Sequence, residues 1–173
     1  MALTHIYCGN GKGKTTAALG LAMRASGAGM KVHIVQLIKG SDTSELSSIS
    51  QLSNITVVRP PKNYGFTRSM SEADKSEIII CHNEMLSEAY KKMCGNEIDM
   101  LIIDEFFAGY NSELVDISLA EKIVFEKSES CELVLTGRNP PEKFIAAADY
   151  VSEITAVKHP YEKGISARRG IEF

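Results

Sequence analysis

The chain has 173 residues with 19 basic and 22 acidic side chains, a formal net charge of −3, and 44% of its residues are apolar. This length predicts one domain over residues 1–173 with a full hydrophobic core, and the composition excludes a disordered or fibrous chain. The mild acidity argues against a nucleic-acid partner, and the lack of a membrane-length apolar run or a leader predicts a cytoplasmic protein without membrane association. The cysteines show no C-x-x-C spacing, so we expect buried, reduced thiols at Cys8, Cys81, Cys94 and Cys131.

The first third of the chain alternates predicted strands with a helix. Residues 3–8 favour a short strand, and glycines interrupt residues 9–13. Residues 14–26 are predicted to be a helix, and strands are expected over residues 31–38 and 55–58. Core-facing spacing in the helix falls on Ala17, Ala18, Leu21 and Ala25.

The same alternation continues to the end. Ser69 and Glu72 have the spacing of a capping box, which predicts a long helix to about Cys94 with Gly95 as its C-cap. The apolar residues 100–104 suit a strand buried on both faces of a parallel sheet. A helix over 119–125, a strand over 132–136, a short helix from Pro140 to Ala148 and a strand over 150–157 follow. The core stripe expected on the long helix is Ile79, Leu86, Ala89 and Met93. This order predicts an α/β fold, a three-layer α/β/α arrangement with a mostly parallel sheet.

The most specific motif is a glycine- and lysine-rich loop between the first strand and the first helix. In such a loop, successive backbone N–H groups and the helix N-terminus bind phosphate oxygens. Lys14 is expected to reach a phosphate, and the Thr15 hydroxyl to bind magnesium. The pattern differs from G-x-x-x-x-G-K-[ST] at its first position, which is Cys8. The motif predicts a P-loop NTPase fold of the RecA-like kind, with an ATP site formed by Gly9, Asn10, Gly11, Lys12, Gly13, Lys14, Thr15 and Thr16.

An acidic pair follows the buried strand over residues 100–104. Open α/β sheets bind ligands at the carboxyl ends of their strands, so Asp104 and Glu105 are expected near the loop. A divalent cation that bridges phosphates prefers oxygen ligands. The sequence therefore predicts a Mg²⁺ or Mn²⁺ site formed by Thr15, Asp104 and Glu105.

Several blocks of the sequence resemble one enzyme family in family order. They are GNGKGKTTAALGLAMRASGAGMKVHIVQLIKG from residue 9, GFT from 65, IDE from 103, LTGRN from 135, ADYVSE from 148, KH from 158 and GISARRGIEF from 164. The chain thereby resembles the cob(I)alamin (corrinoid) adenosyltransferases of the phosphate-loop type found in enteric bacteria.

This resemblance implies a reaction and its participants. A Co(I) corrinoid attacks the 5′-carbon of ATP, adenosylcobalamin or an adenosylated precursor forms, and triphosphate leaves, in cobalamin biosynthesis or salvage. A reduced flavoprotein as electron donor and a homodimer are further implications. The loop would bind the leaving group, which explains why no hydrolytic base is visible.

The resemblance also assigns individual residues. Lys14, Phe66 and Arg138 are the expected catalytic residues, and Arg24 is expected to support the phosphates or ribose of ATP. Phe66 would lie beneath the cobalt and exclude water and the lower axial ligand. Lys39 and Gly40 are equally compatible with a nucleotide contact or a structural role.

Three features depart from the family pattern. Arg68 occupies the position where many relatives carry a second aromatic residue, and residues 41–45 read Ser-Asp-Thr-Ser-Glu instead of an aromatic, proline and glycine before the glutamate. The first strand begins almost at residue 1, whereas relatives carry an N-terminal segment that helps cover the corrinoid. Two alternatives therefore stay open, a small-molecule kinase or NTPase and a non-catalytic sensor of ATP or corrinoid.

Overall fold

The computed structural model describes residues 1–38, 43–64 and 70–172. Strands and helices alternate along most of this chain. In order they are β1 (Thr4–Cys8), α1 (Lys14–Gly27), β2 (Val32–Gln36), α2 (Ser44–Ile49), β3 (Ile55–Val58), α3 (Glu72–Cys94), β4 (Met100–Asp104), α4 (Phe106–Asn111), α5 (Ile117–Phe125), β5 (Glu132–Thr136), α6 (Glu142–Ala147) and β6 (Tyr150–Glu153). A 3₁₀ turn follows at Pro160–Lys163.

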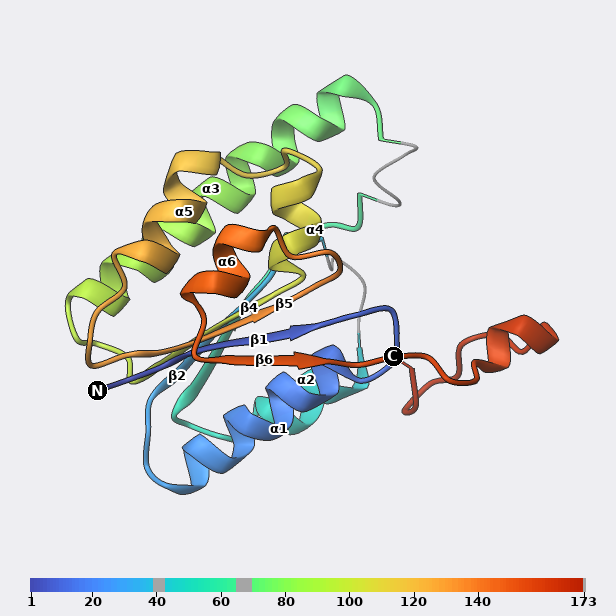
Figure 1. Cartoon of the computed structure of the whole chain (residues 1–173), viewed down its shortest axis with the longest axis horizontal. Helices are drawn as coiled ribbons and strands as arrows, with labels where there is room; N and C mark the ends of the chain where they lie inside the picture. Colours follow the sequence, from blue (N-terminus) through green and yellow to red (C-terminus); the bar gives the residue numbers. More distant parts are fainter. Residues whose placement is uncertain (39–42, 65–69, 173) are drawn as a thin grey trace.

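The described strands form one parallel sheet in the order β3-β2-β4-β5-β1-β6. Helices α1 and α2 cover one face, and α3, α4, α5 and α6 cover the other (Figure 1). This confirms the predicted α/β/α architecture. Strand β5 separates β1, which precedes the glycine-rich loop, from β4, which carries Asp104, and this is the RecA-like arrangement of a P-loop fold.

Two apolar layers hold the sheet between the helices. Side chains of β2, β4 and β5 alternate between a layer that packs on α1 and a larger layer that packs on α3 to α6. In the larger layer, the buried rings of Phe106, Phe107 and Phe144 meet edge to face, with centroids 5.2 to 5.7 Å apart. Both faces of β2 and β4 are therefore buried, which for β4 was predicted from the apolar residues 100–104.

The expected faces of two helices need correction. In α1 the buried apolar residues are Ala18, Leu19, Ala22 and Ala25, whereas Ala17 and Leu21 are half-buried. The long helix begins at Glu72, and its N-cap is Ser71, whose hydroxyl accepts a 3.1 Å hydrogen bond from the Asp74 N–H. Ser69 lies outside the described residues. The buried face of this helix consists of Ile78, His82, Leu86, Ala89 and Met93. The predicted core residue Ile79 is therefore replaced by its neighbour Ile78.

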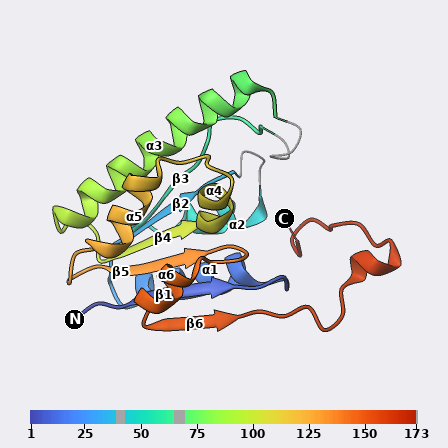
Figure 2. The ribbon, with the colours of Figure 1, turned by 45° about the horizontal axis from the view of Figure 1, so that its top comes forward.

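The ends of the chain also differ from expectation. Strand β6 ends at Glu153 because the backbone of Ile154 turns to the glycine-rich loop, and the chain beyond it runs away from the sheet (Figure 2). Helices α2 and α4, six residues each, were not predicted. All four cysteines are free, but Cys94 is exposed and Cys81 half-buried, so only Cys8 and Cys131 fit the expectation of buried thiols. Among the described helices, none is both long enough and apolar enough to span a bilayer.

Candidate functional site

The glycine-rich loop joins β1 to α1 at the carboxyl end of the sheet. Gly13 is the N-cap of α1 and has φ +123°, a conformation that favours glycine. The buried Lys14 side chain turns back over the loop, and its Nζ donates a 2.9 Å hydrogen bond to the Gly11 carbonyl. A loop closed in this way, at the positive end of a 14-residue helix, can bind an anionic group.

The loop is also held by the chain that leaves β6. The Gly11 N–H donates a 2.7 Å hydrogen bond to the Ile154 carbonyl, and the Asn10 Oδ1 accepts a 3.1 Å hydrogen bond from the Ala156 N–H. The motif predicts that successive backbone N–H groups of the loop face phosphate. The Gly11 N–H is instead used to fix the loop to residue 154.

The predicted acidic pair lies next to this loop. Asp104 is buried at the end of β4, and its carboxylate accepts a hydrogen bond from the Thr15 hydroxyl, with 3.0 and 3.2 Å to its two oxygens. Glu105 follows with φ +59°, in the left-handed region, and is the N-cap of α4. The structure therefore places the Thr15 hydroxyl in contact with Asp104, and Glu105 is the next residue of the chain.

These residues suit a divalent cation shared with phosphate. Within the described ranges, no three or more His, Cys, Asp and Glu side chains cluster as an independent metal site. The Thr15 hydroxyl and the buried Asp104 carboxylate, which are in contact, are hard oxygen donors. Mg²⁺ is commonly bound in this way, by one or two protein oxygens and the phosphates of its nucleotide.

The electrostatics of Lys14 link four charged groups. Burial lowers the pKa of Lys14, and the Arg138 guanidinium lowers it further, whereas the Glu105 and Asp104 carboxylates raise it. Lys14 therefore lies within electrostatic range of both the acidic pair and Arg138. Arg138 itself is exposed and follows Gly137 at the end of β5.

The other residues predicted for the site lie on the surface of the loop, lie far from it, or fall outside the described residues. Lys12, Asn10 and Thr16 are exposed on the loop and on the first turn of α1. Arg24 lies in the last turn of α1, ten residues or about 15 Å along the helix from Lys14. The structure thus does not bring Arg24 to the loop of its own chain. Lys39, Gly40, Phe66 and Arg68 lie outside the described residues.

The structure adds polar residues that sequence analysis did not select. Gln36 and Thr136, at the ends of β2 and β5, both donate hydrogen bonds to the Asp104 carboxylate. The sequence could have indicated them only as polar residues at the ends of predicted strands. The strand order is needed to show that β2 and β5 flank β4.

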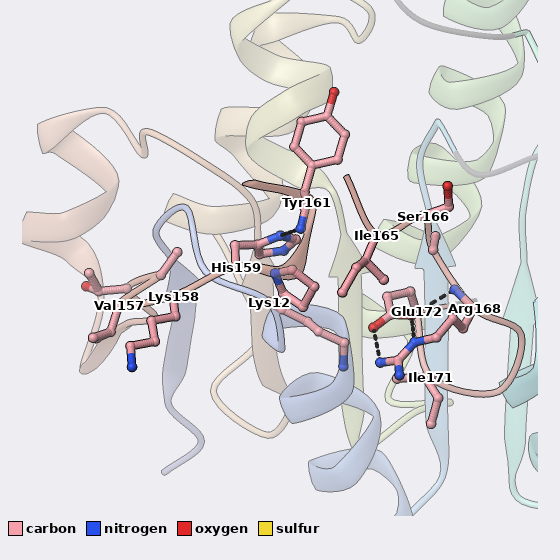
Figure 3. Close-up of a pocket in the computed structure, with 14 residues that line it drawn as sticks. Lys12, Val157, Lys158, His159, Tyr161, Ile165, Ser166, Arg168, Ile171 and Glu172 are labelled. Carbon is pink, nitrogen blue, oxygen red and sulfur yellow. Dashed lines mark hydrogen bonds and ion pairs between the residues drawn. The ribbon is translucent and has the colours of Figure 1, made fainter. Parts of the chain in front are cut away.

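A cavity of about 560 Å³ opens beside the loop, between Lys12 and the C-terminal arm, which we define as residues 155–172. Figure 3 shows Lys12 extending toward Arg168 and Glu172, whose side chains form a 3.1 Å ion pair. The pKa of Glu172 is lowered chiefly by its hydrogen bond to Arg168, with a smaller contribution from Lys12. Several apolar side chains of the arm are exposed, at Val157, Tyr161, Ile165 and Ile171.

Comparison with known proteins gives a consistent result. The family model described as ATP:corrinoid adenosyltransferase BtuR/CobO/CobP matches residues 1–173. The corrinoid adenosyltransferase of a Sinorhizobium species is 32% identical over 175 residues, covering 99% of this chain and 80% of the relative. The corrinoid adenosyltransferase of Escherichia coli K12 is 28% identical, and CobA of Salmonella typhimurium is 26% identical. Each of these two alignments covers 97% of this chain and 84% of the relative.

Proposed function

The chain belongs to the ATP:corrinoid adenosyltransferase family BtuR/CobO/CobP, and we propose that its loop at residues 9–16 binds the triphosphate of ATP as the leaving group of the transfer. The protein is an enzyme of cobalamin biosynthesis or salvage that uses ATP and a corrinoid as substrates. The observation that supports the proposal most strongly is the buried Lys14, held over the loop and within range of Asp104, Glu105 and Arg138.

The proposed transfer breaks one bond and forms another. The electron pair of Co(I) forms a cobalt–carbon bond with the 5′-carbon of ATP, and the bond from that carbon to the α-phosphate oxygen breaks. Its electron pair leaves with the triphosphate, which gains a negative charge. The Lys14 ammonium, the Arg138 guanidinium and the helix N-terminus would stabilise that charge. No proton needs to be removed from an acceptor, so the site requires no general base.

A divalent cation, Mg²⁺ or Mn²⁺, would neutralise part of the triphosphate charge when bound. Thr15 and Glu105 would contribute ligand oxygens, with Asp104 beside them. The 3.0 Å contact between the Thr15 hydroxyl and the Asp104 carboxylate supports this assignment, because it orients the hydroxyl lone pairs away from the acid. The ligands would thus come from α1 and from the end of β4.

The corrinoid would lie against the C-terminal arm. The cavity beside Lys12 adjoins the loop, and its exposed Tyr161, Ile165 and Ile171 side chains offer apolar surface to a macrocycle. A corrinoid held there would present its cobalt close to the 5′-carbon of an ATP bound in the loop. Phe66, which lies outside the described residues, remains the residue proposed to exclude the lower axial ligand.

Residues 1–173 are proposed to act as one domain in a homodimer in the cytoplasm. A reduced flavoprotein is the electron donor proposed for the cobalt of the corrinoid. The exposure of all four β6 residues supports a homodimer, because an open edge strand is a surface for pairing with another chain.

The Lys14→Ala variant tests the phosphate assignment. We expect it to reduce adenosyl transfer from ATP to a chemically reduced corrinoid by at least 100-fold, because the leaving triphosphate loses a buried ammonium. The measurement is formation of the light-sensitive adenosylated corrinoid under anaerobic conditions. Lys91→Ala, which removes an exposed lysine from the last turn of α3, is the matched control and should keep full activity. Full activity in Lys14→Ala would refute the assignment.

The Phe66→Ala variant tests the corrinoid side. If the ring excludes the lower ligand, its loss should slow the reaction that starts from Co(II) corrinoid with a reductant by about tenfold or more. The reaction that starts from pre-reduced Co(I) should change far less, because that cobalt no longer needs the reduction step. Equal losses in the two assays would mean that Phe66 acts only through packing.

A further inference from the structure

Thr136 occupies a central position among the acidic residues of the site. Its side chain is completely buried at the carboxyl end of β5, between β4 and β1. The Thr136 hydroxyl donates a 2.6 Å hydrogen bond to the Asp104 Oδ1, and it accepts a 2.9 Å hydrogen bond from the backbone N–H of Glu105. One hydroxyl therefore contacts both members of the acidic pair.

The second contact constrains an uncommon backbone. Glu105 has φ +59°, a left-handed conformation that few residues other than glycine adopt. Its N–H is directed at Thr136, which anchors the peptide at the point where the chain turns from β4 into α4. The orientation of the Glu105 side chain depends on this turn.

Gln36 holds the other side of the same carboxylate. It pairs with Asp104 in the register of β2 and β4, and its Nε2 donates a 3.3 Å hydrogen bond to the Asp104 Oδ2. Gln36 is 1% exposed, and its Oε1 accepts no hydrogen bond from the described part of the chain. A buried amide oxygen of this kind is suited to accept a hydrogen bond from a ligand-bound water or hydroxyl.

We propose that Thr136 is a positioning residue for the metal–triphosphate complex, and that Gln36 supports it from the neighbouring strand. Thr136 fixes the Asp104 carboxylate, which in turn orients the Thr15 hydroxyl, and it also fixes the backbone that presents Glu105. This inference rests on the proposed binding of triphosphate in the loop. The proposal gives the threonine of the LTGRN segment a specific function, which the resemblance of this segment to the family did not define.

The test separates the Thr136 hydroxyl from the volume of its side chain. Thr136→Val keeps the shape and removes the hydroxyl, whereas Thr136→Ser keeps the hydroxyl. The binding of ATP is measured by calorimetry without corrinoid, once in the presence of Mn²⁺ and once with excess chelator. This measurement does not depend on turnover. In Thr136→Val we expect at least a tenfold weaker Mn²⁺-dependent affinity for ATP and a higher Mn²⁺ concentration for half-maximal activity. Chelator-insensitive binding should change less than threefold, and Thr136→Ser should recover to within about threefold of the natural protein.

Thr4→Val is the matched control. Thr4 is also a buried threonine, at the amino end of β1 and so at the opposite edge of the sheet from the loop. It should leave Mn²⁺-dependent binding of ATP unchanged. If Thr136→Val does not fold, Gln36→Met takes its place, because it removes an amide contact to Asp104 at similar volume and should raise the Mn²⁺ requirement at least threefold.

Two results would overturn the inference. Folded Thr136→Val could bind Mn²⁺ and ATP as tightly as the natural protein, or Thr136→Ser could be as impaired as Thr136→Val. Either outcome could occur in a fully active transferase, so it would leave the proposed function intact. Conversely, a protein whose Mn²⁺-dependent binding of ATP requires the Thr136 hydroxyl but which releases no triphosphate would refute the proposed function and keep this inference.

Discussion

At the scale of single residues, glycines of the loop serve a packing role in addition to the phosphate binding proposed for them. A Cβ atom on Gly11 would lie 2.7 Å from the Ile154 carbonyl oxygen, closer than side-chain carbons approach backbone atoms. The loop therefore needs glycine because residues 154–156 pack directly against it. The sequence predicts glycines for approach to an anion, but this contact depends on a residue more than 140 positions away.

Gly11→Ala should accordingly weaken both the fold and the site. We expect a loss of about 1–3 kcal/mol in the free energy of unfolding, typical of overpacking, and weaker ATP binding because the loop must move from Ile154. Chemical denaturation and ATP titration measure the two effects. Gly20→Ala is the control, since its Cβ meets nothing within 4 Å and lies in α1, where alanine should stabilise by about 0.5–1 kcal/mol. Equal stability of the two variants would contradict this explanation.

Some residues of the candidate site could be predicted from a short stretch of sequence, and others could not. Lys14 and Thr15 follow from a contiguous motif, and Asp104 follows from its place at the end of an apolar strand. Thr136 and Gln36 could not be predicted, because their role depends on which strands are neighbours. Arg24 was assigned by resemblance, and the length of α1 separates it from the loop.

At the scale of elements, the central strands follow from composition. The β-branched run that forms β2 is buried on both faces, and this burial encloses His33 as well as its apolar neighbours. The His33 Nδ1 lies 2.6 Å from the Thr56 hydroxyl on β3, and Nε2 is buried without a partner among the described residues. The pKa of His33 is lowered to about 4, chiefly by burial and to a smaller extent by the charge of Lys92, against the opposing effect of Glu88. The sequence pattern predicts the strand, but it does not predict that His33 is buried in it with a lowered pKa.

This burial predicts a pH-dependent stability. Between about pH 6.5 and pH 4 the unfolded chain binds a proton at His33 and the folded chain does not, so the free energy of unfolding should fall as the pH falls. The full effect of this group is about 3 kcal/mol. Urea denaturation across this range measures it, and His33→Leu should flatten the slope by close to one proton. An unchanged slope in His33→Leu would show that other groups cause the loss.

Short elements and element ends were the least predictable features. The capping motif of α3 lies at Ser71, two residues after the predicted Ser69, and both positions carry a serine. Strand β6 ends four residues before the predicted end, where the Ile154 carbonyl accepts a hydrogen bond from the Gly11 N–H of the loop. A tertiary contact thus accompanies the end of β6, whereas the cap of α3 is a local hydrogen bond between Ser71 and Asp74.

At the scale of the whole molecule, strand order decides which chemistry is possible. The order β4-β5-β1 places Asp104, Thr136 and the loop after Cys8 at adjacent strand ends. The C-terminal arm then adds a second wall beside Lys12 (Figure 3). The sequence predicted the α/β class, and it singled out the glycine-rich loop and the acidic pair as candidates for a phosphate site, whereas the arm could only be recognised through its resemblance to the family.

The central claim is that the loop binds triphosphate as a leaving group. The most direct measurement is the product balance of one anaerobic reaction of the natural protein with reduced corrinoid and ATP labelled at the γ-phosphate. We predict one triphosphate, with the label retained in it, for each adenosylated corrinoid formed. Labelled orthophosphate and ADP without a cobalt–carbon product would contradict the claim.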